Sequence, residues 1–247
     1  MLALVPFSGG KDSQACLKLA CAHYGASNVK ALFCDTKFEH PETYLHVLST
    51  VIRYGVSLDI VSEGDVLQQS ERFGRFPGGG SRHCTDYLKI QPTKKYIARK
   101  AADLGKPFEV WYGMRLDESV ERKKRYAGKV SDELYPPHEV MPRKYPQYLY
   151  KKFGIQFRLA VLDWSKLDVL EYLEGEEHMH YDLGFDRVGC FPCLASGDAH
   201  KEKAFAYDEF GADQKKKVMI VSQKIGKSIW TSKGGIARNG GCAVCSI

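Results

Sequence analysis

The sequence predicts an α/β fold in which helices cover both faces of a parallel sheet. Three observations lead to this prediction. Short apolar runs alternate with segments of helical periodicity. The apolar runs are continuous, as expected for strands that are buried on both faces. The first run ends in a glycine-rich turn that leads directly into a helix, which is the beginning of a β-α-β unit.

The apolar pattern in the first quarter of the chain predicts three strands and two helices. Strands are expected over residues 2–7, 29–34 and 56–61. Apolar positions on one face predict a helix that follows the turn and ends near Gly25, and a second helix over residues 41–54 that stops at Gly55.

The pattern loosens after Glu63. Residues 73–81 carry glycines and a proline that exclude regular structure, and residues 118–152 are charged and contain four prolines, which predicts a long excursion over the surface. The other expected elements are a helix over 91–104, a strand over 108–112, a strand over 157–162, a helix over 166–173 and a basic helix around 215–225. From Cys190 the chain turns rich in cysteine and glycine. A boundary near residue 185 therefore separates an α/β domain, residues 1–185, from a small cysteine-rich region, residues 186–247.

Composition and charge narrow the function classes. Of the 247 residues 44% are hydrophobic, which excludes wholesale disorder. No apolar run approaches the roughly 18 residues of a spanning helix, and the first run lacks the flanks of a signal peptide, so we expect a cytoplasmic protein with no membrane partner. The 36 Lys and Arg outnumber the 30 Asp and Glu, giving +6, which suits nucleotides or nucleic acid. Eight cysteines in such a chain indicate metal ligands or reactive thiols.

The most specific feature is the turn SGGKDS, residues 8–13. Its glycines let backbone amides approach an anion, and the following helix offers free N–H groups and a positive dipole end. Lys11 adds a charge, and Ser8 and Ser13 add hydroxyl groups. A phosphate chain is the natural ligand, although the spacing is not that of a Walker A loop. The alternative is a tight turn with no ligand.

The turn resembles the pyrophosphate loop of the adenine nucleotide α-hydrolase superfamily. Five further motifs follow in order: Asp35-Thr36 with Glu42, residues 82–85 with Lys89, residues 113–119 with Arg122, residues 162–164 with Asp168-Val169, and Gly184-Phe185 with residues 189–193. Over residues 2–200 the chain resembles the phosphoadenosine phosphosulfate reductase family. This resemblance implies a HUP-type, Rossmann-like fold and makes residues 1–185 a nucleotide-binding domain.

The resemblance also implies roles for single residues. Ser8, Gly9, Gly10, Lys11 and Ser13 would bind the phosphates of ATP. Asp12 would be a Mg²⁺ ligand or a brace for the loop, and Asp35 would aid nucleotide or metal binding. Arg115 and Arg122 would clamp phosphate or sulfate, because guanidinium groups match such oxyanions; a solvated charged helix start is the alternative. The expected catalytic set is Lys11, Asp12, Arg115 and Asp117.

Two CxxC pairs, Cys190/Cys193 and Cys242/Cys245, have the spacing of metal ligands, and Cys84 is a fifth candidate. Cluster-bearing members of the family join a Cys-Cys pair to a later CxxC to hold a [4Fe–4S] cluster. Here Thr85 follows Cys84, so one ligand is missing, and our hypothesis is a cluster on Cys84, Cys190, Cys193 and one of the last two cysteines. A Zn²⁺ site on both pairs and a mobile redox pair at Cys242/Cys245 stay open.

Other residues receive less specific interpretations. Cys16, Cys21 and Cys34 fit the apolar patterns and are expected in the core, and Trp164 and Tyr172 are expected to pack. His83, His178, His180 and His200 are expected to have surface or supporting roles. Basic clusters and the tyrosines of residues 145–150 could bind a single strand of nucleic acid, with ordinary solvated surface as the alternative. The clusters are Lys94-Lys95, residues 122–125, Arg143-Lys144, Lys151-Lys152 and residues 215–217.

The intact turn distinguishes two enzyme classes. Sulfonucleotide reductases of the family have a degenerate loop and end in a tail with a nucleophilic cysteine, whereas this chain keeps SGGKDS and ends in GGCAVCSI. We therefore expect an ATP pyrophosphatase that adenylates an acceptor for sulfur insertion, of the DNA phosphorothioation or tRNA thiolation type. A cysteine desulfurase or another donor would supply sulfur, and homo-oligomers are compatible with the sequence. The alternatives are a phosphoadenylylsulfate reductase and a module that binds nucleotide or nucleic acid without turnover.

Overall fold

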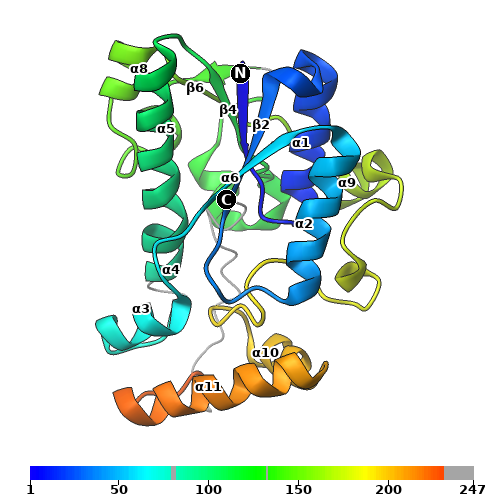
Figure 1. Ribbon diagram of the computed structural model, residues 1–247, viewed down its shortest axis with the longest axis vertical. Helices are drawn as coiled ribbons and strands as arrows, with labels where there is room; N and C mark the ends of the chain where they lie inside the picture. Colours follow the sequence, from blue (N-terminus) through cyan, green and yellow to red (C-terminus); the bar gives the residue numbers. More distant parts are fainter. Residues whose placement is uncertain (79–81, 132, 231–247) are drawn as a thin grey trace.

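The structure is a computed structural model that describes residues 1–78, 82–131 and 133–230 (Figure 1). A six-stranded sheet forms its centre, in the order β3-β2-β1-β4-β6-β5. The strands are β1 (Ala3–Pro6), β2 (Val29–Cys34), β3 (Ser57–Val61), β4 (Glu109–Trp111), β5 (Leu134–Tyr135) and β6 (Gln156–Arg158). Five strands run parallel and β5 pairs antiparallel with β6 at one edge. The predicted Rossmann-like sheet is confirmed, with an antiparallel edge that the sequence did not predict.

Helices cover both faces of this sheet, as in other α/β folds. The longer ones are α1 (Lys11–Tyr24), α2 (Pro41–Tyr54), α3 (Val66–Phe73), α5 (Gln91–Leu104), α9 (Lys166–Leu173), α10 (Asp198–Phe205) and α11 (Glu209–Ile225). The shorter ones are η1 (Ala26–Asn28), α4 (His83–Thr85), η2 (Asp86–Ile90), η3 (Leu116–Glu118), α6 (Val120–Arg125), α7 (Pro137–Val140), α8 (Tyr148–Phe153) and η4 (Met179–Tyr181). In Figure 1, α5 and α8 lie on one side of the strands, and α1, α2 and α9 lie on the other. Among the described residues no helix combines the length and the apolar character needed to cross a membrane.

Alternate residues of each strand pack in two separate cores. Leu4 and Leu32 join the cluster that contains Ile97 of α5, whereas Val5 and Ala31 join the cluster that contains helix residues of α1 and α2. Successive side chains of a strand point to opposite faces, so a strand that is covered on both sides must be apolar throughout. This explains why the runs read as continuous in the sequence.

Local signals set most helix boundaries. Pro41 begins α2 and Gly55 closes it in a left-handed conformation with φ 66°. Ser165 and Asp168 form a capping box at the start of α9. By contrast, α3 was not predicted, because only Val66 and Ser70 of this helix are buried and its apolar period is therefore short. The strand expected over 157–162 is limited to β6, since the chain turns after Arg158.

The prediction that residues 118–152 form a surface excursion is wrong. Tyr126, Tyr145 and Leu149 are buried in the same cluster as the sheet residues. The Tyr145 and Tyr112 hydroxyl groups lie 2.6 Å apart in the interior. The large apolar side chains of this segment stand at irregular intervals between charged residues. They therefore follow neither a helical nor a strand period, and the sequence does not show that they are buried.

The C-terminal helices pack beneath the carboxyl ends of the strands. Phe205 of α10 and Val218 of α11 join a cluster with Phe38, Val66 and Leu88. Figure 1 shows α11 below α3, and α10 beside α11. The predicted basic helix is α11. The boundary near residue 185 stays a prediction, although side chains from both sides of it share this core.

Candidate nucleotide site and cysteine cluster

The glycine turn lies between β1 and α1, at the carboxyl end of the central strand. Gly9 has φ 79°, and a Cβ added there would lie 3.2 Å from the side chains of Thr43 and Val47, so this position requires glycine. Gly10 begins α1 without any side-chain cap. Ser13 Oγ donates to the Gly10 carbonyl oxygen at 2.8 Å and fixes the turn. The N-cap residue thus leaves the first amides of α1 uncapped, as an anion site requires, although a tyrosine from a distant segment accepts from the Lys11 amide.

Arg115 and Asp12 form a buried pair beside the turn. Arg115 Nε donates to Asp12 Oδ1 at 2.8 Å, and both side chains are nearly inaccessible. Arg115 Nη1 is buried and makes no hydrogen bond among the described residues; its ion-pair distance to Asp117 Oδ2 is 3.5 Å. A buried guanidinium nitrogen without a hydrogen bond is costly unless a ligand satisfies it. Asp12 holds Arg115 in place by this contact. Its two expected roles, as a Mg²⁺ ligand or as a brace for the loop, stay predictions.

Three other residues that the sequence predicts at the site, Arg122, Asp117 and Asp35, differ from one another in exposure and in partners. Arg122 is buried and pairs with Glu118, and burial lowers its pKa to about 10, although Tyr126 and Asp12 oppose that shift. The alternative interpretation of Arg122 as part of a solvated helix start is therefore wrong. Asp117 is about half exposed. Asp35 accepts hydrogen bonds from Tyr44 Oη at 2.7 Å and from the Lys37 amide at 2.8 Å, so its carboxylate is engaged on the side of α2.

A small cavity lies over the turn, and the C-terminal half of the chain contributes part of its wall. It is lined by Ser8, Gly10, Lys11, Asp12, Ser13, Glu118, Tyr181, Asp186, Arg187 and Val188. Tyr181 Oη accepts from the Lys11 amide at 3.2 Å, and Lys11 Nζ lies 4.6 Å from the centre of the Tyr181 ring. Burial lowers the pKa of Lys11, and Asp12 opposes that shift. The sequence did not reveal Tyr181 and Arg187. Arg187 lies between Gly184-Phe185 and residues 189–193, which together form one motif, but neither residue is part of that motif.

Three of the predicted cluster ligands are brought to one place. Cys84, Cys190 and Cys193 all act electrostatically on the side chain of Lys89. Burial alone would lower the pKa of Lys89, but these thiols together with Glu39 outweigh it and raise the pKa. Cys190 is also held by its neighbours: Thr36 Oγ1 lies 3.3 Å from its Sγ, and its backbone bridges to that of Glu39.

The other cysteines are the three that were expected in the core and the C-terminal CxxC pair. Cys16 and Cys34 are buried, as predicted, and burial raises the pKa of Cys34 to about 11. Cys21 is partly buried, and burial also raises its pKa to about 11. Cys242 and Cys245 lie outside the described residues.

Comparison with known proteins identifies the family. Residues 3–196 match the model of the phosphoadenosine phosphosulfate reductase domain. The chain belongs to this family.

Relatives within and near this family were also found. An uncharacterised protein of Methanocaldococcus jannaschii is 30% identical over 207 residues, which is 81% of this chain and 38% of that protein. An adenosine 5'-phosphosulfate reductase of Pseudomonas aeruginosa is 26% identical over 171 residues, which is 67% of this chain and 57% of that protein. The chain therefore spans about half the length of these curated relatives. A phosphoadenylyl-sulfate reductase from Candida auris superposes with a TM-score of 0.48 at 16% identity, covering 76% of this chain and 81% of that one.

This phosphoadenosine phosphosulfate reductase domain also contains a row of histidines that the sequence did not reveal. The rings of His46 and His178 are 4.9 Å apart, those of His178 and His180 are 4.3 Å apart, and His40 lies 5.2 Å from His180. His83, His178 and His180 are buried, so of the two roles expected for them, surface or supporting, the surface role is excluded. Two of these contacts, His46 with His178 and His40 with His180, join residues more than 130 positions apart.

Acidification should destabilise the domain through His46. Burial, followed by the charges of Arg53 and His180, lowers its pKa from 6.5 to about 4. The unfolded chain therefore binds a proton between pH 6.5 and 4 that the folded chain excludes, so stability is full above pH 6.5 and falls as the pH drops. At pH 5 we expect a loss of about 1–2 kcal/mol from this residue. Urea unfolding at pH 7 and pH 5 measures it, and His46→Gln should show the smaller loss. Equal losses in both proteins would contradict the assignment.

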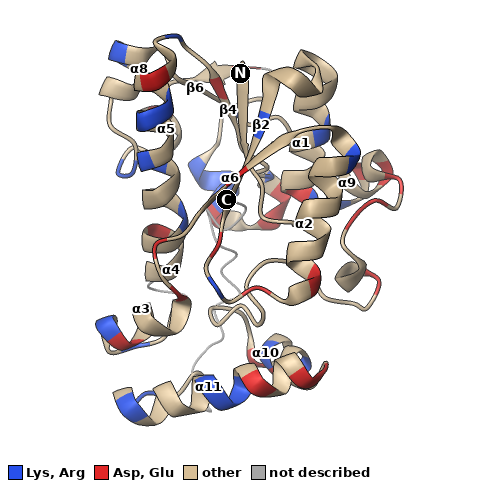
Figure 2. Ribbon diagram, in the orientation of Figure 1, with Lys and Arg blue, Asp and Glu red and all other residues tan. Residues whose placement is uncertain are grey.

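The basic clusters do not share one face of this domain. Figure 2 shows Lys and Arg on α8 at one end of the molecule and on α11 at the other. Arg122 and Tyr145, which were expected at the surface, are buried, whereas Tyr148 and Tyr150 are exposed. Trp164 and Tyr172 pack edge to face at 5.2 Å, as predicted.

Proposed function

We propose that this family member is an ATP pyrophosphatase that adenylates an acceptor and forms AMP and pyrophosphate, preparing the acceptor for sulfur insertion. The single observation that supports it most is the glycine turn, where Gly10, the buried Lys11 and Asp12, which holds Arg115, line one cavity. Such an arrangement suits a phosphate chain better than it suits any uncharged ligand.

The proposed chemistry uses these groups as follows. An acceptor oxygen attacks the α-phosphorus of ATP, the bond to the bridging oxygen breaks, and pyrophosphate leaves with its negative charge. Lys11, the amides of α1 and Arg115 would bind the departing phosphates, and charge stabilisation there lowers the barrier. Oxygen ligands suit Mg²⁺, and Asp186 lines the same cavity together with Glu118, whose carboxylate also pairs with Arg122, so Asp186 is the residue there that best fits this ion. When bound, Mg²⁺ would neutralise charge on the phosphates.

The cysteines support sulfur transfer as the second half of the reaction. Around a single tetrahedral Zn²⁺ the sulfur atoms lie roughly 3.8 Å apart. Among the described residues no three cysteine sulfurs approach one another within 4.8 Å, although all three act on Lys89. The three are therefore too far apart to share one Zn²⁺, whereas a [4Fe–4S] cluster would take them as ligands with Cys242 or Cys245 as the fourth. A Zn²⁺ held by both CxxC pairs would use only Cys190 and Cys193 of these three and stays the alternative.

Hydrosulfide would then form the new bond to the acceptor as AMP leaves. A cysteine desulfurase would supply this sulfur as a persulfide, from which a second thiol releases hydrosulfide and forms a disulfide; another donor could supply hydrosulfide directly.

We propose a nucleic acid as the acceptor, because the chain combines an ATP site with cysteines that could relay sulfur. Lys215–Lys217 on α11 and the exposed Tyr148 and Tyr150 on α8 provide charged and stacking groups. These lie at opposite ends of the molecule, so one short strand would contact only one of them.

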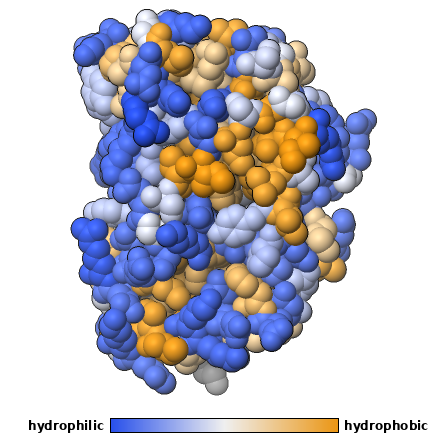
Figure 3. Space-filling view, in the orientation of Figure 1, coloured by the Kyte–Doolittle hydropathy of each residue, from blue (hydrophilic) through white to orange (hydrophobic). Residues whose placement is uncertain are grey.

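A homo-oligomer would also place copies of these charged and aromatic surfaces side by side. Figure 3 shows an apolar area on the face that carries α2, where Leu45, Leu48 and Ile52 are exposed.

The test is direct. Anaerobically purified protein is incubated with Mg²⁺ and labelled ATP, with and without DNA or tRNA, and AMP and pyrophosphate are measured. Formation of both products, stimulated by one nucleic acid, is the expected result. ATP that remains intact under every condition would overturn the proposal.

A second candidate function is reduction of a sulfonucleotide to sulfite. The family match and the Pseudomonas relative, whose name is that of a reductase, favour it. Labelled phosphoadenylylsulfate with thioredoxin tests it in parallel. Sulfite formation with ATP untouched would establish the reductase, whereas binding of nucleotide without any product would leave the non-catalytic module.

Replacement of Cys190 should remove the cluster and leave the nucleotide site. Cys190→Ser is expected to lose most of its iron, its acid-labile sulfide and its visible absorbance, because a hydroxyl is a poor ligand for the cluster iron. Binding of ATP, measured by equilibrium dialysis, should stay within about twofold, since Cys190 does not line the cavity over the turn. Cys21→Ser is the matched control. Iron that is unchanged in Cys190→Ser, or absent from the unaltered protein, would contradict the cluster.

A further inference from the structure

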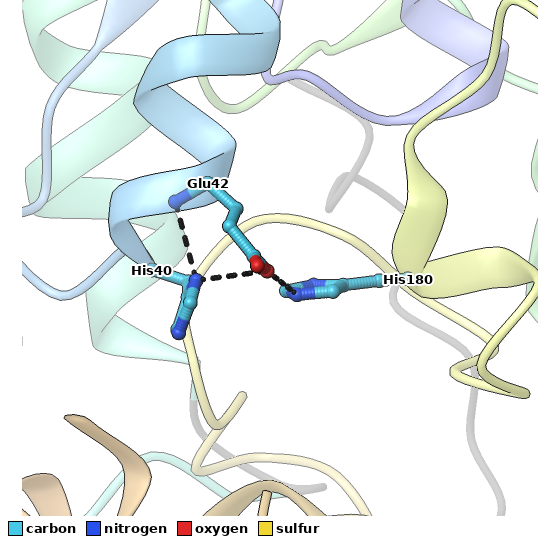
Figure 4. A group of neighbouring side chains, drawn as sticks. All are labelled: His40, Glu42 and His180. Atoms are coloured by element: carbon cyan, nitrogen blue, oxygen red, sulfur yellow. Dashed lines mark hydrogen bonds and ion pairs between the residues drawn. The ribbon is translucent and has the colours of Figure 1, made fainter. Parts of the chain in front are cut away.

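A group of ligand-type side chains lies outside both sites described above. His40 is the residue before α2, Glu42 is in its first turn, and His180 is in η4 (Figure 4). One ligand atom from each lies within 4.8 Å of the other two, and no other group of three in the described part of the chain meets that condition. Both histidines are buried, whereas the side chain of Glu42 is 31% exposed.

The carboxylate of Glu42 is the centre of this group. Its Oε2 lies 2.6 Å from His180 Nε2 and 3.2 Å from His40 Nδ1. In Figure 4 both rings direct a nitrogen toward this oxygen. Around a tetrahedral Zn²⁺, nitrogen and oxygen ligands are roughly 3.3 Å apart, so the His180 nitrogen and the Glu42 oxygen would need to separate by roughly 0.7 Å. The proton now shared between Nε2 and Oε2 would leave when a cation takes its place.

The surroundings of His40 resemble those of a metal-bound histidine. Its other nitrogen, Nε2, lies 2.9 Å from Asp208 Oδ2. A carboxylate on the far nitrogen of an imidazole fixes the ring and makes the near nitrogen a better ligand. The near nitrogen accepts only one long bond, 3.2 Å from the Glu42 amide, so little is lost when a cation replaces that contact.

We propose that His40, Glu42 and His180 bind a divalent transition metal ion, with Zn²⁺ as the best match. Two imidazoles and one carboxylate form a ligand set that Zn²⁺ accepts, with water as the fourth ligand on the exposed side of Glu42. Mg²⁺ prefers oxygen ligands and is disfavoured here.

The metal would join three segments that are distant in sequence. It ties the start of α2 to η4 and, through Asp208, to the start of α11. The residue after His180 is Tyr181, which covers the glycine turn and accepts from the Lys11 amide. The ion would thus fix η4 over the nucleotide cavity, which is a positioning role and is independent of the reaction proposed above.

Cobalt spectroscopy separates this site from the cysteines. Metal-free protein is titrated with Co²⁺, which gives visible ligand-field bands at any tetrahedral site but near-ultraviolet sulfur charge-transfer bands only at thiolates. The expected result is that Glu42→Gln and His180→Gln each lose one cobalt equivalent and its visible bands, while the charge-transfer bands stay. The double variant Cys190→Ser/Cys193→Ser should lose the sulfur charge-transfer bands and keep the cobalt equivalent that Glu42 and His180 bind. Competition with Zn²⁺ then gives the affinity.

Two further variants guard against a trivial loss of fold. Asp208→Asn keeps a cap for the Gly211 amide but removes the carboxylate from His40, and should weaken Zn²⁺ binding about 10–100-fold. His46→Gln lies in the same histidine row but outside the group of three and should bind metal as the unaltered protein does. Circular dichroism confirms folding of each variant. An unchanged cobalt stoichiometry in folded Glu42→Gln or His180→Gln would show that the group is only a hydrogen-bonded contact.

Discussion

Replacing Lys11 with methionine is expected to lower ATP cleavage by about 100–1,000-fold, since each charge-stabilising donor of this kind contributes about 3–4 kcal/mol to the transition state. Lys11 is buried at the start of α1 and lies over the ring of Tyr181, in the wall of the cavity. Methionine keeps the length and the apolar stem of the side chain but removes the charge. The measurement is the rate of AMP and pyrophosphate formation at saturating ATP.

A matched control lies on the same helix. Lys18 donates to the Tyr172 carbonyl oxygen and pairs with Glu174 and Glu176, away from the cavity. Lys18→Met should therefore retain the full rate of ATP cleavage. If Lys11→Met also cleaves ATP at the normal rate while folding normally, the glycine turn is not the site of pyrophosphate release.

The part of the site that could be predicted is the part made by neighbouring residues. The turn of residues 8–13 needs only one strand, two glycines and one helix, all of which are legible over a few positions. Helix ends at Gly55 and Ser165 are also local, because capping groups act within one turn. The three clustered cysteines were predicted from spacing and resemblance together, and folding brings Cys84 to the later pair.

The part that could not be predicted depends on pairs that are far apart along the chain. Tyr181 reaches Lys11 across 170 positions, and His180 reaches Glu42 across 138. Tyr181 and His180 belong to no periodic pattern and to no motif, so a short stretch of sequence around either residue does not mark it. The buried residues of 118–152 failed for a related reason: Tyr126 and Tyr145 are isolated between charges, and only the completed sheet supplies their neighbours.

Substitution of Gly113 by alanine is expected to damage stability and activity together. Gly113 follows β4 where this strand meets the glycine turn, and an added Cβ would lie 2.5 Å from the Asp12 carbonyl oxygen and 2.7 Å from the Ser13 amide nitrogen. These are backbone atoms at the start of α1, which cannot rotate aside as a flexible side chain would. We therefore expect the two segments to separate, at a cost of about 2 kcal/mol.

For a chain of this size that cost lowers the thermal midpoint by about 4–8 °C. The displaced atoms belong to Asp12 and Ser13, so ATP cleavage should fall even at temperatures where the variant is folded, because small errors in position strongly reduce catalysis. Gly78→Ala is the matched control, since a Cβ added there meets no atom within 4 Å. A Gly113→Ala protein with an unchanged midpoint and unchanged ATP cleavage would mean that the segment after β4 does not press against the turn. Arg115, two residues further on, would then lose its structural reason for lying beside Asp12.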